Sequence, residues 1–83
     1  MIYVIGEALI DIIVDAEGKV LASVVGGAPL NTARTISRLD VSATFLGGIS
    51  TDAFGNRIMR LLAEDGVHYA LGSQVPEPTT LAI

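Results

Sequence analysis

The strongest constraint on the fold of this chain is an alternation between short apolar runs and segments of helical periodicity. The runs Ile2–Ile5 and Ala43–Leu46 have the length and apolar character of strands, and Ile2–Ile5 is expected to be a buried central strand. Apolar residues recur at helical spacing in Pro29–Leu39 and again after Asp52. Because strands that alternate with helices form βαβ units, the pattern predicts an α/β fold with a mostly parallel sheet.

The segment between the first run and the first helix predicts a β-hairpin. The turn residues Asp15–Gly18 separate the extended run Ile12–Val14 from a second strand-like run, Lys19–Val25. After the second helix we expect a strand at Val67–Leu71 and a loop at Gly72–Pro78. A further strand is expected at Thr79–Ile83.

Several residues in and next to the two helices are expected to have structural roles rather than to bind a ligand. Asp52 precedes the second helix and is predicted to be its N-cap rather than a ligand contact. Gly66 fits the C′ position of the same helix. Arg34, Arg57 and Arg60 are expected on solvated helix faces.

Composition limits the size of the fold and the classes of partner. The chain has 83 residues, which allows one domain, and 51% of them are hydrophobic, so we expect apolar faces and an open sheet edge that further protein covers. A net charge of −4 with scattered basic residues argues against a nucleic-acid partner. There is no cysteine and a single histidine, so no metal site is predicted. No apolar run is long enough to span a membrane and no signal peptide is visible, so a cytoplasmic protein is expected.

The connection from the hairpin to the first helix has the composition of a ligand-binding turn. Gly26 and Gly27 lack a Cβ, so the backbone there can approach a ligand closely. Pro29 suits the first turn of a helix, and Asn31 adds an amide that both donates and accepts hydrogen bonds. The stretch lacks the Lys-Ser/Thr pair of a Walker loop and the third glycine of a dinucleotide fingerprint. Spacing alone leaves two interpretations: an ordinary strand–turn–helix connection, or a site for a small polar ligand at a helix N-terminus.

Asp11 is the second candidate for binding a ligand. It lies between Ile10 and Ile12 in an otherwise apolar run, near the edge of the sheet where ligands of open α/β folds collect. A carboxylate in such a run needs a partner or a water-filled cleft, unless it lies on the solvated face of an alternating strand. Both interpretations of Asp11 remain open at this point.

Five stretches, taken together and in order, resemble the amino-terminal part of the PfkB (ribokinase-like) carbohydrate kinases. They are Val4–Glu7 with Asp11, Gly26–Ala33, Asp52–Gly55, Leu62–Val67 and Pro78–Thr79. The resemblance covers nearly the whole chain and implies an incomplete, amino-terminal portion of a ribokinase-like three-layer α/β fold. Residues 1–83 would be the sugar-binding portion of one kinase domain, with a β-lid hairpin at about residues 12–25.

The resemblance also assigns roles to individual residues. Asp11 and Asn31 match residues that hydrogen-bond sugar hydroxyls, and Gly26 and Gly27 match glycines that lie against the sugar. The catalytic base, the ATP site and the Mg²⁺ implied by the family belong to a carboxyl-terminal part, so this chain alone is expected to be inactive. The family usually has Gly or Ser at the position of Asp40, which implies a small cost in stability.

The stretches Gly6–Asp11 and Gly26–Pro29 look most like those of fructokinases, and fructose is the expected substrate. A kinase for a sugar acid such as 2-keto-3-deoxygluconate is the nearest alternative. The resemblance also implies a homodimer through the lid or the open sheet edge. Two other interpretations remain: a non-catalytic module that binds another chain through that edge, and an unrelated nucleotide-binding domain with Gly26-Gly27 as a phosphate turn.

Overall fold

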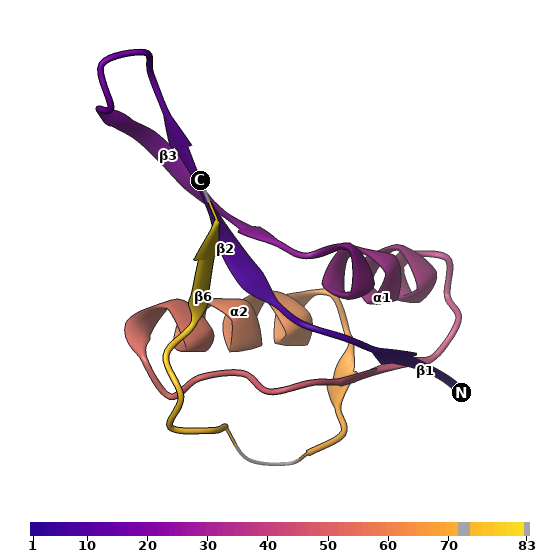
Figure 1. The fold of residues 1–83 in the computed structure, drawn as a ribbon. Helices are drawn as coiled ribbons and strands as arrows, with labels where there is room; N and C mark the ends of the chain where they lie inside the picture. Colours follow the sequence, from indigo (N-terminus) through magenta and orange to yellow (C-terminus); the bar gives the residue numbers. More distant parts are fainter. Residues whose placement is uncertain (72–73, 83) are drawn as a thin grey trace.

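The computed structural model describes residues 1–71 and 74–82, and these residues form two small sheets and two helices (Figure 1). In chain order the elements are β1 Ile2–Ile5, β2 Leu9–Val14, β3 Val20–Gly26, α1 Ala28–Arg38, β4 Ala43–Leu46, α2 Ala53–Glu64, β5 His68–Tyr69 and β6 Thr80–Ala82. The predicted hairpin, both helices and the strand Ala43–Leu46 are therefore present. Gly72 and Ser73 of the predicted loop, and Ile83 of the last predicted strand, lie outside the described residues.

The strands form two three-stranded sheets rather than the mostly parallel sheet that the sequence predicts. The first has the order β1-β4-β5 and is parallel throughout. The second has the order β3-β2-β6, with β2 antiparallel to β3 and parallel to β6. The second sheet forms because the hairpin diverges from the first sheet after β1, and its strand β2 pairs with β6, which is distant in the sequence (Figure 1).

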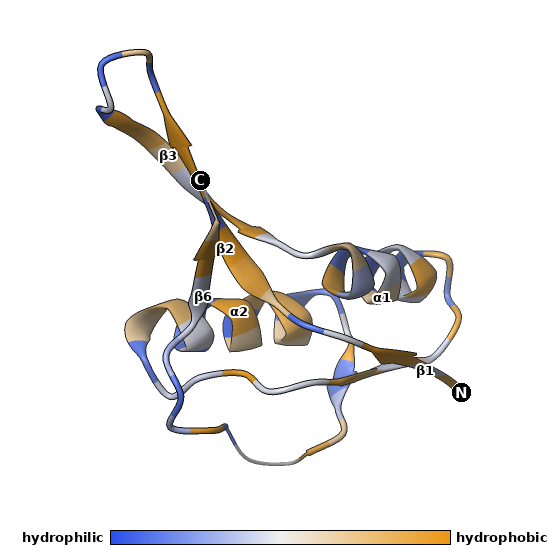
Figure 2. Cartoon of the chain, in the orientation of Figure 1, coloured by the Kyte–Doolittle hydropathy of each residue, from blue (hydrophilic) through white to orange (hydrophobic). Residues whose placement is uncertain are grey.

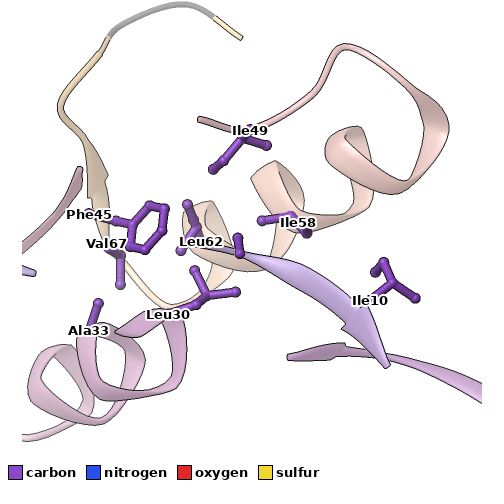
Figure 3. Packing of buried hydrophobic residues seen from close by; sticks show 9 residues of the cluster. Ile10, Leu30, Ala33, Phe45, Ile49, Ile58, Leu62 and Val67 are labelled. Carbon is purple, nitrogen blue, oxygen red and sulfur yellow. The ribbon is translucent and has the colours of Figure 1, made fainter. Parts of the chain in front are cut away.

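Both helices cover the same face of the first sheet. The connections β1-α1-β4 and β4-α2-β5 step across the sheet in the same direction, and right-handed crossovers then place both helices on one side. Figure 3 shows the core that results, in which Phe45 of β4 lies among Leu30 of α1 and Leu62 of α2. Ile10 of β2 and Ile58 of α2 are also fully buried, so the second sheet shares this core.

The prediction that Ile2–Ile5 is a buried central strand is wrong. β4 occupies the centre of its sheet, and β1 is an edge strand that pairs only with β4 among the described residues. Tyr3 and Ile5 are 63% and 70% exposed, because their side chains lie on the face of the sheet that carries no helix. The strand predicted at Val67–Leu71 is shorter, and only His68–Tyr69 pair with β4.

The two helices end in the same motif but with different residues. In α1 the amide of Asp40 donates to Ser37 and that of Val41 to Ile36, which is the Schellman pattern. In α2 the amide of Gly66 donates to Ala63 and that of Val67 to Leu62. The motif requires a positive φ at its C′ residue, which is 61° for Asp40 and 72° for Gly66. Gly66 confirms the predicted C′ position, whereas Asp40 holds a conformation that favours glycine.

We predict that Asp40→Gly stabilises the chain by roughly 0.5–1 kcal/mol, because it removes the steric cost of a left-handed residue with a side chain. The matched control is Gly66→Asp, which places the same side chain in the same motif of α2 and is expected to destabilise by a similar amount. Urea denaturation followed by circular dichroism measures both changes. If Asp40→Gly shows an unchanged or lower midpoint, this account of the α1 terminus is wrong.

Candidate functional site

The geometry of the candidate site is set at Gly27, where β3 passes into α1 without a spacer. Gly27 is the N-cap of α1 and has a φ of 102° and a ψ of 121°, a combination that residues with a Cβ rarely adopt. A Cβ at this position would lie 2.7 Å from the carbonyl oxygen of Glu7. The helix has no side-chain cap at this end, and Pro29 occupies its first turn as predicted.

Glycines also allow the surrounding backbone segments to come together. Gly6, directly after β1, lies against the ring of Pro29 so closely that a Cβ would overlap the ring. Gly47, directly after β4, lies equally close to the carbonyl oxygen of Gly6. The carboxyl ends of β1 and β4 therefore meet the N-terminus of α1, and in open α/β sheets this is the edge where ligands bind.

Asp11 lies directly over Gly26. In the register of the hairpin Asp11 is opposite Val24 and Leu9 is opposite Gly26, so Asp11 and Gly26 are diagonal neighbours on one face of the sheet. The carboxylate oxygen Oδ2 of Asp11 occupies the space where a Cβ on Gly26 would be. Asp11 is partly exposed, and among the described residues its side chain makes no hydrogen bond or ion pair.

Asn31 lies one helical turn beyond Gly27 and is joined to it through the backbone. Its amide N–H donates to the carbonyl of Gly27 across 3.0 Å. The side chain is exposed, and its amide group forms no hydrogen bond within the part of the chain that the structure describes. The side-chain oxygens and nitrogen of Asp11 and Asn31 are therefore free of protein partners there.

The four predicted site residues form one continuous region, but that region is open to solvent. Asp11 contacts Gly26, Gly26 is followed by Gly27, and Gly27 is hydrogen-bonded to Asn31. A cleft of about 430 Å³ lies between β3 and the two helices, and another of about 340 Å³ lies beside Glu7. Neither cleft is lined by the four residues, so a ligand on them would have protein on one side only.

The prediction that Arg34 and Arg57 lie on solvated helix faces is wrong. Arg34 forms an ion pair with Asp65, whose carboxylate also binds Arg38 at 3.1 Å. Hydrogen bonding from Arg34 is the main cause that holds the pKa of Asp65 below its ordinary value. Arg57 donates hydrogen bonds to Ser23 of β3. No local pattern in the sequence signals these pairs, because their members are about thirty residues apart.

Asp52 is the N-cap of α2, as predicted, and it also binds a distant segment. Its Oδ1 accepts from the amide of Gly55 at 2.7 Å, which is the capping hydrogen bond. Thr79 donates its hydroxyl to Oδ1 at 2.6 Å and its backbone amide to Oδ2 at 2.8 Å. The hydroxyl of Thr79 is the largest of the influences that lower the pKa of Asp52 to about 2. The sequence missed the contact with Thr79.

The described residues contain no group of three acidic, histidine or cysteine side chains that is close enough to hold a metal ion. They also contain no helix with the length and apolar character needed to cross a membrane. The polar groups of the site are thus one carboxylate, one amide and the backbone around two glycines. Such a set can exchange hydrogen bonds with an uncharged, hydroxyl-rich ligand.

Comparison with known proteins gives a consistent result along the whole chain. The family described as pfkB family carbohydrate kinase matches residues 1–83. A fructokinase of Klebsiella pneumoniae is 38% identical over 66 residues, which are 80% of this chain and 21% of the relative. The chain therefore spans about a fifth of the length of the curated relatives that it matches.

Solved structures of sugar kinases have the same fold. An uncharacterized sugar kinase from Pyrococcus horikoshii superposes with a TM-score of 0.82 at 30% identity, over 98% of this chain and 30% of that one. A fructokinase from Vibrio cholerae O395, in a form with bound fructose, ADP and calcium ion, gives a TM-score of 0.71 at 27% identity, over 98% of this chain and 25% of that one. The ribokinase-like α/β fold and its incomplete, amino-terminal extent are thereby confirmed.

We predict that Gly27→Ala destabilises the chain by about 2–3 kcal/mol, because it adds a strained φ and a clash with the carbonyl of Glu7. Gly18→Ala is the matched control. Gly18 has a φ of 85°, but a Cβ there would meet nothing within 4 Å, so only the conformational cost of about 1 kcal/mol is expected. Urea denaturation measures both variants, and equal losses would show that the close approach to Glu7 is unimportant.

We also predict that part of the acid sensitivity of the fold comes from Asp52. Its pKa is about 2 in the folded chain and 3.8 ordinarily, so its ionised form stabilises the fold above about pH 4 and this contribution is lost as the pH falls through 2. The difference in melting temperature between the wild type and Asp52→Asn should be constant near neutral pH and shrink between about pH 4 and pH 2. A difference that does not change over this range would contradict the assignment.

Proposed function

Because the chain belongs to the pfkB family of carbohydrate kinases, we propose that it supplies the sugar-binding portion of a kinase that transfers a phosphoryl group from ATP to a sugar hydroxyl. The observation that carries this proposal is the grouping of Asp11, Gly26, Gly27 and Asn31 at the junction of the hairpin with α1. These are the same four residues that the resemblance assigns to the sugar.

The chemistry of these groups suits a sugar. The ionised carboxylate of Asp11 accepts hydrogen bonds from neighbouring hydroxyls, and such charge-assisted bonds are stronger than neutral ones. The amide of Asn31 can donate to one hydroxyl and accept from another. The missing Cβ of Gly26 leaves room for the carboxylate of Asp11, and the missing Cβ of Gly27 lets the start of α1 lie next to that carboxylate's strand.

We propose fructose as the sugar. The support is the similarity to fructokinases, including the Klebsiella pneumoniae relative and the Vibrio cholerae structure with bound fructose. A sugar acid such as 2-keto-3-deoxygluconate is the alternative substrate. A carboxylate would meet the negative charge of Asp11, and this favours an uncharged sugar.

Phosphoryl transfer needs groups that these residues do not provide. It depends on positioning and on positive charge around the transferred phosphate, usually with Mg²⁺. The Vibrio cholerae structure contains ADP, which supports a nucleotide as the co-substrate. We propose that a further segment of a complete kinase provides the ATP and Mg²⁺ sites and the second wall over the sugar, and that residues 1–83 alone release no ADP when given ATP and fructose.

We further propose that the hairpin, at about residues 12–25, forms the lid over the sugar and contacts a second copy of the chain. Its exposed apolar side chains support this, and they are Ile13, Val20, Leu21 and Val24. Figure 2 shows that both strands of the hairpin are largely apolar as they extend from the helices. The exposed edge and open face of β1 are the alternative contact surface.

A non-catalytic function is the second candidate, because the same apolar surfaces fit a module that only binds another polypeptide. Complementation separates the two functions. The carboxyl-terminal remainder of a fructokinase, added to this chain, should restore ADP release that depends on fructose if the chain is part of a kinase. Tight association without any ADP release would favour the binding module.

The role of Asp11 can be tested by substitution in this chain. Asp11→Asn keeps the size of the side chain but removes its charge, so fructose binding should weaken by roughly 10- to 100-fold. Glu17→Gln is the control, since it removes a carboxylate from the exposed turn of the same hairpin. Isothermal titration with fructose measures both. Equal affinities for Asp11→Asn and the wild type would contradict the assignment of Asp11 to the sugar.

A further inference from the structure

Helix α2 and its N-cap are hydrogen-bonded to one edge strand of the hairpin sheet and to the residue that precedes the other. In the order β3-β2-β6, β3 and β6 are the two edge strands, and β2 with Asp11 lies between them. One contact joins Arg57 of α2 to Ser23 of β3. The other joins Asp52, the N-cap of α2, to Thr79, the residue before β6. The helix therefore holds the sheet at two separate points.

The contact at β3 lies near the point where the hairpin extends away from the helices. Arg57 donates through Nη1 to the hydroxyl of Ser23 at 2.9 Å and through Nη2 to its carbonyl oxygen. Ser23 is partly buried, whereas Val20–Ala22 are exposed and extend away from the helices (Figure 1). The guanidinium thus covers a backbone acceptor of an edge strand at the place where the hairpin leaves the body of the chain.

The contact at β6 acts through the backbone as well. Thr79 gives both its amide and its hydroxyl to Asp52, and β6 starts at the next residue. β6 then pairs with β2 from Leu9↔Thr80 to Asp11↔Ala82. A shift of Thr79 relative to α2 would therefore be passed along β6 to the strand that carries Asp11.

The spacing of the two contacts matches the width of the sheet. Arg57 follows Asp52 by five positions, which is a rise of about 7.5 Å along a helix. The two edge strands of a three-stranded sheet are about 9.6 Å apart, which is twice the distance between neighbouring strands. The length of an arginine side chain covers the difference. A helix that crosses beneath the sheet can therefore reach one edge with its N-cap and the other with Arg57.

We propose that Arg57 and Asp52 are positioning residues that fix the hairpin sheet on α2 and so set the separation between Asp11 and Asn31. Asp11 and Gly26 move with the sheet, whereas Asn31 belongs to α1. The direct covalent joint between β3 and α1 is Gly27, whose freedom of rotation does not by itself hold the sheet at one angle. The packing of Ile10 in the shared core holds the inner end of β2 against α2, and the two polar contacts add restraint at the edges of the sheet. The consequence for sugar binding rests on the proposed function, but the restraint itself does not.

Hydrogen exchange of the intact 83-residue chain tests the restraint, with Arg57→Gln compared with Arg60→Gln. Both variants remove one guanidinium from α2, but Arg60 is exposed and contacts no hydrogen-bond or ion-pair partner among the described residues. Exchange of the amides of β3 should rise at least threefold in Arg57→Gln and stay unchanged in Arg60→Gln. The amides of α1 should not change in either variant, which separates loss of position from loss of stability. Equal exchange of β3 in the two variants would overturn the proposal.

Two further variants keep the test decisive if Arg57→Gln folds poorly. Arg57→Lys retains one donor toward Ser23 and should restore part of the protection of β3. Thr79→Val removes only the hydroxyl bond to Asp52 and leaves the cap on Gly55, so exchange should rise in β2 and β6 but not in α2. Loss of protection in α2 instead would mean that Asp52 acts only as a helix cap, and this would overturn its part in the proposal.

Fructose affinity gives the functional readout. Arg57→Gln should weaken fructose binding at least threefold, Arg57→Lys should recover part of it, and Arg60→Gln should bind as the wild type does. If the wild type binds no fructose but β3 loses protection in Arg57→Gln, the proposed function fails and the restraint stands. If the wild type binds fructose and Arg57→Gln binds equally well, the positioning role is overturned while the proposed function stands.

Discussion

The arrangement of this chain depends on the close approach of Gly27 to the carbonyl of Glu7. At that point the hairpin has returned to the end of β1, and β3 continues directly into α1. A positive φ at a residue without a Cβ lets the chain turn there while it stays in contact with the β1–β2 connection. Gly6 and Gly47 extend the same close contact to Pro29 and β4. The backbone that the proposed sugar site requires is therefore the backbone that joins the two sheets.

Helix α2 provides the second constraint, because some of its residues stabilise the helix itself and also contact segments that are distant in the sequence. Asp52 caps the helix and binds the segment that enters β6, and its depressed pKa reflects both roles. Ile58 and Leu62 of the helix fill the shared core, while Arg57 reaches the hairpin. One face of α2 packs in the core, while Asp52 and Arg57, at its start and in its N-terminal half, contact Thr79 and the hairpin.

The sequence predicted well those features that depend on neighbouring residues. The hairpin, both helices, the N-cap Asp52 and the C′ residue Gly66 each follow from local patterns of apolar and turn residues. The four site residues came from a resemblance spread over the chain, and the structure brings them into one region. The errors concern long-range partners, which no local pattern encodes. Ile2–Ile5 is an edge strand because β4 lies at the centre of the sheet. Arg57 is hydrogen-bonded to Ser23 of β3 rather than to solvent.

The central claim is that fructose binds where the hairpin meets α1. Amide chemical shifts of the isotopically labelled chain, followed by NMR during titration with fructose, test this claim most directly. Fructose bound at this junction should give saturable shifts centred on Asp11, Gly26, Gly27 and Asn31. Shifts centred instead on the cleft beside Glu7 and Thr79, or no shifts at millimolar fructose, would contradict the account and favour a chain that serves only to bind another polypeptide.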